Sequence, residues 1–385
     1  MKSICLVDPS LFYPNNPPFH PAVVYPELAA NGFFSTGHNH VYDALRKIFL
    51  HAGLDAELYG SPEWNPLGGW IKPGHHVMLK PNWVYHFPHG ENENHHLTTH
   101  SSVLRVVLDY VVVALKGRGK VTIADGPIQS SLFETIVKDH QIEAVVNEYK
   151  RYHDLSVSVI DLRCEEVDAP SNKIVERRKV LDDPLGHLEI NLESRSYLEG
   201  LLSNGNNVSF LVPGYVENST NIHHRQGVHR YLIAKTVLDA DVFINLPKMK
   251  THKRAGITGA LKNLVGINGS KAYLAHAYRD KITGGDEFSK RTWKTRLAHF
   301  MDFEIKERLP YPLWSLAWKS WKFYKRRLNT VFRESGGGRG SELLSFGGGW
   351  HGNKTIWRMV YDLNTIIFFA DKNGILHNKP QRKYL

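Results

Sequence analysis

The feature that most constrains the fold is a succession of short Val- and Ile-rich runs separated by segments with helical periodicity. Most runs show no strict alternation of apolar and polar residues, which is typical of strands buried on both faces. Strand, helix and strand in repetition predict an α/β fold with a mostly parallel sheet covered by helices on both faces. The predicted strands are 3–8, 76–80, 120–125, 157–161, 208–212, 241–246 and 365–371, and the predicted helices are 41–53, 101–117 and 229–240.

Composition excludes several classes of protein. Of the 385 residues, 42% are hydrophobic and 22% are charged, which is ordinary globular usage and excludes wholesale disorder. Two cysteines, Cys5 and Cys164, are too few for a disulfide scaffold, a four-thiolate zinc site or a conventional iron–sulfur cluster. The start of the chain lacks a signal peptide, and no run approaches the ~20 apolar residues of a membrane span. We therefore expect a cytoplasmic protein without an iron–sulfur cluster.

The segment 241–276 contains the highest density of residues that could bind a ligand or take part in catalysis. A predicted strand ends at Pro247, and cations, glycines and polar residues follow at close intervals. Backbone amides beside glycines, together with lysines after a strand, make a concavity suited to phosphate or carboxylate. The alternative is a solvated basic loop. The polar and glycine positions are Lys248, Lys250, His252, Lys253, Arg254, Gly256, Gly259, Lys262, Asn263, Gly266, Gly269, Lys271 and His276.

Two further strand ends carry polar residues before a turn. Lys80 and Asn82 flank a proline after the strand 76–80, and Asp125 precedes Gly-Pro after the strand 120–125. Ligands of parallel sheets usually lie at the carboxyl ends of the strands. Asp125 is a candidate general base or metal ligand, and its alternative role is to cap a turn.

Histidine is unusually frequent, with 22 in the chain. His223, His224 and His229 form one group, and His276 lies further along. Imidazole is a common ligand of divalent metals, so we consider a metal site at these four residues. No diagnostic spacing such as HExxH occurs, and a surface or hydrogen-bonded role is the alternative.

The segment 306–334 combines tryptophan with positive charge. Trp314, Trp318 and Trp321 are spaced to lie on one face of a helix, and lysines and arginines surround them. This helix either packs into its own domain or lies on an anionic membrane surface. A Gly-rich tract at 334–350 follows. Nucleic acid is not the expected partner: the sequence pI of about 9.3 meets the charge criterion, but no nucleic-acid-binding motif is present.

Four segments resemble the family known as domain of unknown function 362: LKPNWV, TIADGPIQ, the block PKMKTHKRAGITGALKN within 223–271, and WRMVYDLNTIIFFAD. The resemblance extends from about residue 4 to 385, and the PKMKTH block is specific. It is closest in character to a subgroup found beside glycosyltransferases in surface-polysaccharide gene clusters. The resemblance therefore implies a role in making cell-surface polysaccharide.

The chain departs from that family in three respects. The ferredoxin-like cysteine motif of many members is absent, and Ser270, Ala272 and Ala277 replace a His, an Asp and a second His in the loop that keeps Lys271 and His276. Members typically continue beyond the equivalent of Leu385 with another strand and a Gly-rich loop. We therefore expect a truncated C-terminal part that a partner chain or oligomer would complete.

A fainter likeness links the block NLPKMKTH to GALKNLVGI with the family that includes the nickel-pincer lactate racemase. It implies a metal-dependent racemase, epimerase or oxidoreductase as one alternative function.

Together these patterns predict an α/β core at 1–300, a basic Trp-rich helical insertion with its Gly-rich loop at 301–350, and a return to the core at 351–385. We expect an enzyme, or enzyme fragment, acting on an anionic small molecule such as a sugar phosphate or carboxylated sugar. Asp125, His252 and Lys250 are the predicted catalytic residues. The predicted substrate-binding residues are Lys80, Asn82, Lys248, Lys262, Asn263, Gly266 and Lys271. The alternative is a non-catalytic binding or assembly protein held at the inner face of the membrane by Trp314, Trp318 and Trp321.

Overall fold

The computed structural model describes residues 4–7, 12–31, 39–86, 96–202, 208–212, 215, 218–252, 254–280, 285–286, 296–297, 300–334 and 353–385. For 325–334 it describes the backbone alone. Lys253 and most of the Gly-rich tract predicted at 334–350 lie outside the described residues.

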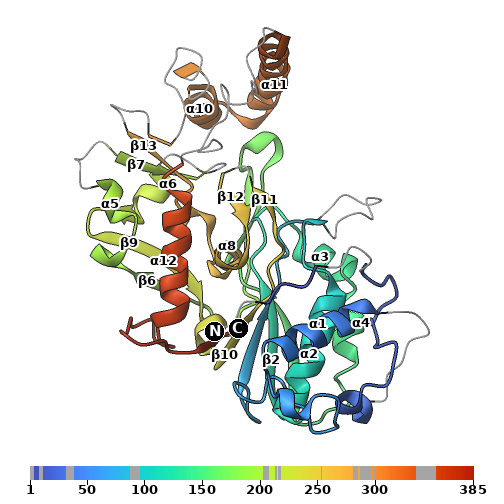
Figure 1. The fold of residues 1–385 in the computed structure, drawn as a ribbon. Helices are drawn as coiled ribbons and strands as arrows, with labels where there is room; N and C mark the ends of the chain where they lie inside the picture. Colours follow the sequence, from blue (N-terminus) through green and yellow to red (C-terminus); the bar gives the residue numbers. More distant parts are fainter. Residues whose placement is uncertain are drawn as a thin grey trace.

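A five-stranded sheet, with every pairing parallel, forms the centre of the molecule (Figure 1). Its strands run in the order β14 (Lys383–Tyr384), β10 (Val242–Asn245), β1 (His76–Lys80), β2 (Gly119–Asp125) and β3 (Leu155–Asp161). Four of these strands were predicted from the sequence, and the predicted parallel α/β fold is confirmed. The register pairs Lys80 with Asn245, so polar residues end neighbouring strands at the same edge.

Helices α1 (His40–His51), α2 (Ser101–Leu115), α3 (Phe133–Asp139) and α4 (Ile142–Asn147) cover one face of the sheet (Figure 1). Val77 and Leu79 of β1 belong to the core on this side. Helix α2 is buried along nearly its whole length and includes an ion pair between Arg105 and Asp109. The hydroxyls of Tyr42 and Tyr149 donate to the same Asp109 carboxylate, so this buried charge is fully surrounded by partners.

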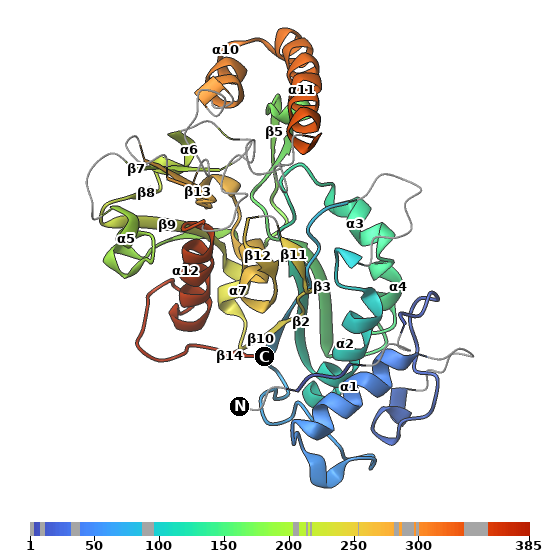
Figure 2. The same cartoon turned by 45° about the horizontal axis from the view of Figure 1, so that its top comes forward.

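Helices α7 (Lys235–Asp239), α8 (Ala260–Asn263) and α12 (Ile356–Phe369) lie on the opposite face (Figure 2). The prediction of a strand at 365–371 is wrong, because most of that run is the last part of α12. Ile356, Met359, Leu363 and Ile367 recur with helical spacing and are all buried. An apolar run as short as TIIFFA cannot by itself distinguish a buried strand from a buried helix.

Two other sequence predictions need correction. The segment 229–240, expected to be one helix, is mainly β9 (Val228–Ala234) followed by the short α7. Its apolar residues alternate in burial, as the period of a half-buried strand requires. No strand forms at Ile4–Val7, the described part of the run predicted at 3–8.

Small antiparallel sheets extend the molecule beyond the central sheet. They comprise β6 (His187–Asn191) with β9 and β8 (His224–Arg225), β7 (Val208–Leu211) with β13 (Ala277–Asp280), β4 (Glu165–Asp168) with β5 (Glu176–Lys179), and β11 (Lys250–His252) with β12 (Gly256–Thr258). The strand predicted at 208–212 is therefore present, but in a two-stranded sheet. Short helices α5 (Glu199–Leu202) and α6 (Asn218–Asn221) lie beside these sheets.

The predicted Trp-rich helix is confirmed as α11 (Tyr311–Glu334), which follows a π-helical turn (Phe300–Ile305) and α10 (Lys306–Arg308). Figures 1 and 2 show α10 and α11 at the periphery, far from both termini. Among the helices in the described ranges, none has both the length and the apolar character of a transmembrane span.

Candidate functional site

A buried ion pair lies where β1 and β2 end. The Lys80 ammonium, which has no exposed surface, lies 2.5 Å from Asp125 Oδ1. The other carboxylate oxygen accepts a 2.6 Å bond from the Trp83 amide, and the Gly126 amide also donates to Oδ1. Burial lowers the pKa of Lys80, and the charge of Asp125 opposes that shift. The pair is hydrogen-bonded on all sides, so Asp125 holds Lys80 and the following turn in place.

Three asparagines extend this pair into a network. Asn263, at the end of α8, accepts a 2.7 Å bond from Asn82 and donates one of 2.7 Å to Asn245 at the end of β10. Its amide also donates to the carbonyls of Lys80 and Pro81. The ends of β1 and β10 are therefore hydrogen-bonded to α8, the helix that follows the PKMKTH block, and the Lys80–Asp125 pair links the end of β2 to them. Asn245 was missed as a site residue, although its position at the end of the strand DVFIN was a usable signal.

Two glycines allow the backbone to approach the ion pair. A Cβ atom added at Gly266 would lie 2.0 Å from Asp125 Oδ1 and 2.9 Å from Lys80 Nζ. A Cβ at Gly126 would meet the Gly266 carbonyl oxygen at 2.7 Å. Gly266, predicted to bind an anion, thus packs directly on the buried pair, and no side chain fits there without displacement.

Lys250 reaches the same network from β11. Its ammonium donates a 2.7 Å bond to Asn82 Oδ1 and another to the Leu97 carbonyl. Burial, with a further contribution from the charge of Lys248, lowers the pKa of Lys250 to about 8. An amine with that pKa exchanges a proton near neutral pH.

The basic residues of the following loop differ from Lys80 because no carboxylate pairs with them among the described residues. Arg254, Lys262 and Lys271 are largely removed from solvent. Burial and then neighbouring positive charges lower the pKa of Lys262 and of Lys271 to about 8. The ammonium of Lys271 lies 5.8 Å from the ring centroid of Tyr215. We call Arg254, Lys262 and Lys271 the unpaired cation cluster. Arg254 was noted in the sequence but not counted among the predicted binding residues.

Two histidines beside this cluster are uncharged at neutral pH. Burial, with the charges of Lys262, Arg254 and Lys250, lowers the pKa of His252 to about 4. Its Nδ1 accepts from the amides of Arg254 and Ala255, so the ring proton is on Nε2. Burial and the charges of Arg254, Lys271 and Lys262 lower the pKa of His276 as well. Because His276 Nδ1 lies 2.8 Å from the Leu274 carbonyl, it carries the proton, and Nε2 keeps its lone pair.

Other predicted residues lie apart from this network. Lys248 contacts Tyr13, with its ammonium 3.3 Å from the hydroxyl. His223 stacks on Tyr273 at a ring separation of 3.5 Å, and His224 Nε2 donates to the Tyr273 carbonyl. His229 Nε2 lies 2.8 Å from Glu199 Oε2. In the described part of the chain, no three His, Cys, Asp or Glu side chains converge as a metal site would need.

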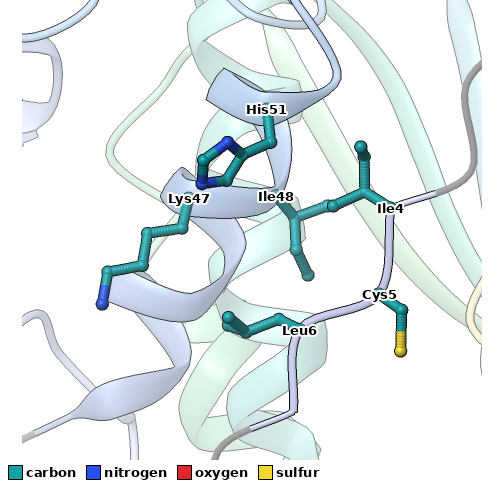
Figure 3. A pocket seen from close by; sticks show the side chains of 6 residues that line it. All are labelled: Ile4, Cys5, Leu6, Lys47, Ile48 and His51. Atoms are coloured by element: carbon teal, nitrogen blue, oxygen red, sulfur yellow. The ribbon is translucent and has the colours of Figure 1, made fainter.

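A pocket of about 440 Å³ lies elsewhere, between the N-terminal segment and α1 (Figure 3). Ile48 of α1 faces Ile4 and Leu6 there, and Lys47 and His51 lie beside it. None of the predicted site residues lines this pocket, so it is separate from the network at the strand ends.

Comparison with known proteins identifies one relationship. The sequence model of a family described as Domain of unknown function (DUF362) matches residues 77–184 and 204–378. These ranges contain all of the network and the unpaired cation cluster. No curated protein and no solved structure matches the chain significantly.

Proposed function

The chain belongs to the DUF362 family, and on the basis of its site we propose that it is an enzyme that binds an anionic small molecule at the unpaired cation cluster. The ligand class that fits best is a sugar phosphate or a carboxylated sugar, in keeping with a role in cell-surface polysaccharide biosynthesis. The proposal rests above all on one observation: Arg254, Lys262 and Lys271 are partly buried, and no carboxylate of the described residues pairs with them.

Buried like charges are unfavourable unless an opposite charge compensates them. Lys80, the fully buried cation of the site, has such a partner in Asp125. A phosphate or carboxylate placed among Arg254, Lys262 and Lys271 would supply the missing charge through short, charge-assisted hydrogen bonds. Phosphate suits three cations better than carboxylate does, because it carries more charge and more acceptor oxygens.

The neighbouring residues support an acid–base role beside the bound anion. Lys250, with its pKa near 8, is the group best suited to transfer a proton at neutral pH. His252, whose Nδ1 is occupied by two backbone amides, donates through Nε2 and would polarise a substrate oxygen. Asn82 orients Lys250, and the Lys80–Asp125 pair positions the turn that carries Asn82.

Isothermal titration calorimetry with glucose 1-phosphate, galacturonate and uncharged glucose tests this proposal. We expect binding of at least one anionic ligand, no binding of glucose, and loss of binding in Lys262→Ala and Arg254→Ala. Lys138→Ala is the matched control, because Lys138 is an exposed lysine at the end of α3. Absence of anion binding in the wild-type chain, or equal binding in all variants, would contradict the proposal.

A further inference from the structure

Helix α11 has two unlike faces, and the tryptophans occupy the inner one. Trp314 is fully buried, and its indole nitrogen donates a 3.0 Å bond to the Ser171 carbonyl. Trp321 is 6% exposed, and the ring of Trp318 lies 5.6 Å from that of Trp314. The tryptophans therefore fasten the helix to the body of the protein, and any external partner must contact other residues.

The outer face of α11 carries an exposed apolar stripe. Leu313, Leu316, Phe323 and Tyr324 are 57%, 68%, 61% and 41% exposed. Their spacing of i, i+3, i+10 and i+11 places all four on one side of the helix, with Ser320 between them. Single exposed apolar residues are ordinary on protein surfaces, whereas a continuous apolar stripe on one helix indicates a contact surface.

Positive charge lies at one edge of this stripe, and the stripe contains no acidic residue. Lys319 and Lys322 are exposed, and Lys319 falls at the edge of the stripe beside Phe323. The helix continues through Lys325, Arg326 and Arg327. The sequence from Tyr311 to Arg333 contains no Asp or Glu. An apolar face with a basic border and no acidic residue is the pattern of helices that lie in the interface of an anionic bilayer.

The corner that leads into α11 is fixed to the body of the protein. The Lys173 ammonium, from the segment joining β4 and β5, donates to the carbonyls of Lys306, Glu307 and Leu309. These carbonyls belong to α10 and to the turn before α11. Together with the Trp314 contact, they hold the stripe in a defined orientation at the periphery (Figure 2).

We propose that α11 binds an anionic phospholipid surface through Leu313, Leu316, Phe323 and Tyr324, with Lys319 contacting the headgroups. Apolar side chains enter the headgroup region, and each lysine near the surface adds electrostatic attraction. A second copy of this chain is a poorer occupant, because a symmetric contact would bring the same basic residues together.

Vesicle sedimentation of the full chain tests this proposal. We expect sedimentation with vesicles of phosphatidylglycerol and phosphatidylcholine, little with phosphatidylcholine alone, and at least about tenfold weaker binding in 0.5 M salt. The double variant Leu316→Asp/Phe323→Asp should lose binding by about tenfold or more. Leu181→Asp is the matched control, because Leu181 is 75% exposed and lies outside α11.

Two measurements show whether the double variant is folded. Its affinity for the sugar phosphate, measured by calorimetry, and its melting temperature should both match those of wild type. Two results would overturn the proposal: no sedimentation of wild type with anionic vesicles at low salt, or equal sedimentation of the double variant. A wild-type dimer that becomes a monomer in the double variant, without vesicle binding, would assign the stripe to self-association instead.

Discussion

Two groups of charged side chains in this protein differ in whether a carboxylate pairs with them. Arg105 is paired with Asp109 inside the α2 core, and Lys80 is paired with Asp125 at the strand ends. Arg254, Lys262 and Lys271 follow in the segment after β11, and no carboxylate of the described residues pairs with them. The paired charges are satisfied within the fold, whereas in our proposal an anionic ligand supplies the counter-charge of the unpaired cation cluster. On that proposal, the difference separates residues that maintain the structure from residues that bind a ligand.

The largest expected effect comes from breaking the paired group. Asp125→Ala leaves the Lys80 ammonium buried without a counter-charge and removes the acceptor of two backbone amides. We expect the free energy of unfolding to fall by about 3–5 kcal/mol, measured by chemical denaturation. Adding Lys80→Met to this variant should restore part of the loss. A loss below about 1 kcal/mol would show that the pair contributes little to stability.

The second largest effect on stability is expected at Gly266, whose backbone packs closely against the same Lys80–Asp125 pair. Gly266→Ala forces its Cβ against Asp125 and Lys80, so we expect a loss of about 1–3 kcal/mol. Gly259→Ala is the matched control, because a Cβ there has no neighbour within 4 Å. Thermal melts of both variants measure the difference, and equal melting temperatures would refute the steric argument.

The unpaired cation cluster should respond in the opposite direction. Lys262→Met removes a partly buried charge that no carboxylate of the described residues pairs with, so the ligand-free protein should become more stable by about 1–2 kcal/mol after allowance for solvent screening. The same variant should no longer bind glucose 1-phosphate. Lys138→Met, at an exposed position, should change neither property. If Lys262→Met instead lowers the free energy of unfolding, the charge of Lys262 is satisfied within the fold, as that of Lys80 is.

A pH series gives the smallest effect. The pKa of Lys262 and of Lys271 is about 8 in the folded chain, below the ordinary value of 10.5. Between these values the unfolded chain binds more protons, so the free energy of unfolding should rise as the pH increases from about 8 to 10.5. Anion binding needs the charged form and should weaken above pH 8. The test compares the melting temperatures of wild type and of the double variant Lys262→Met/Lys271→Met across this pH range, with and without phosphate. If the melting temperature of the double variant depends on pH as that of wild type does, the two lysines do not cause the rise.

Sequence patterns were most informative where the local signal and the tertiary environment agree. The strands at 76–80 and 120–125 and the helix at 101–117 were predicted nearly to their boundaries, because the first two are short Val- and Ile-rich runs and the third is too long for a strand. The run at 365–371 was misassigned because short apolar runs fit both structures. The place of Asn245 at the end of a predicted strand marked it as a candidate, but only its contacts with Asn263 and Tyr384, both distant in sequence, show its role.

The sequence by itself determined the parallel α/β architecture, the basic Gly-rich block after the strand 241–246 and the tryptophan face of α11. These features depend on residue type and spacing within short segments. Only the tertiary structure decided that Asp125 neutralises Lys80, that no carboxylate in the described part of the chain neutralises Arg254, Lys262 or Lys271, and that the tryptophans of α11 point inward. Pairing and burial depend on residues far apart in the chain, because a charge is satisfied by whatever the fold brings within a few ångströms of it.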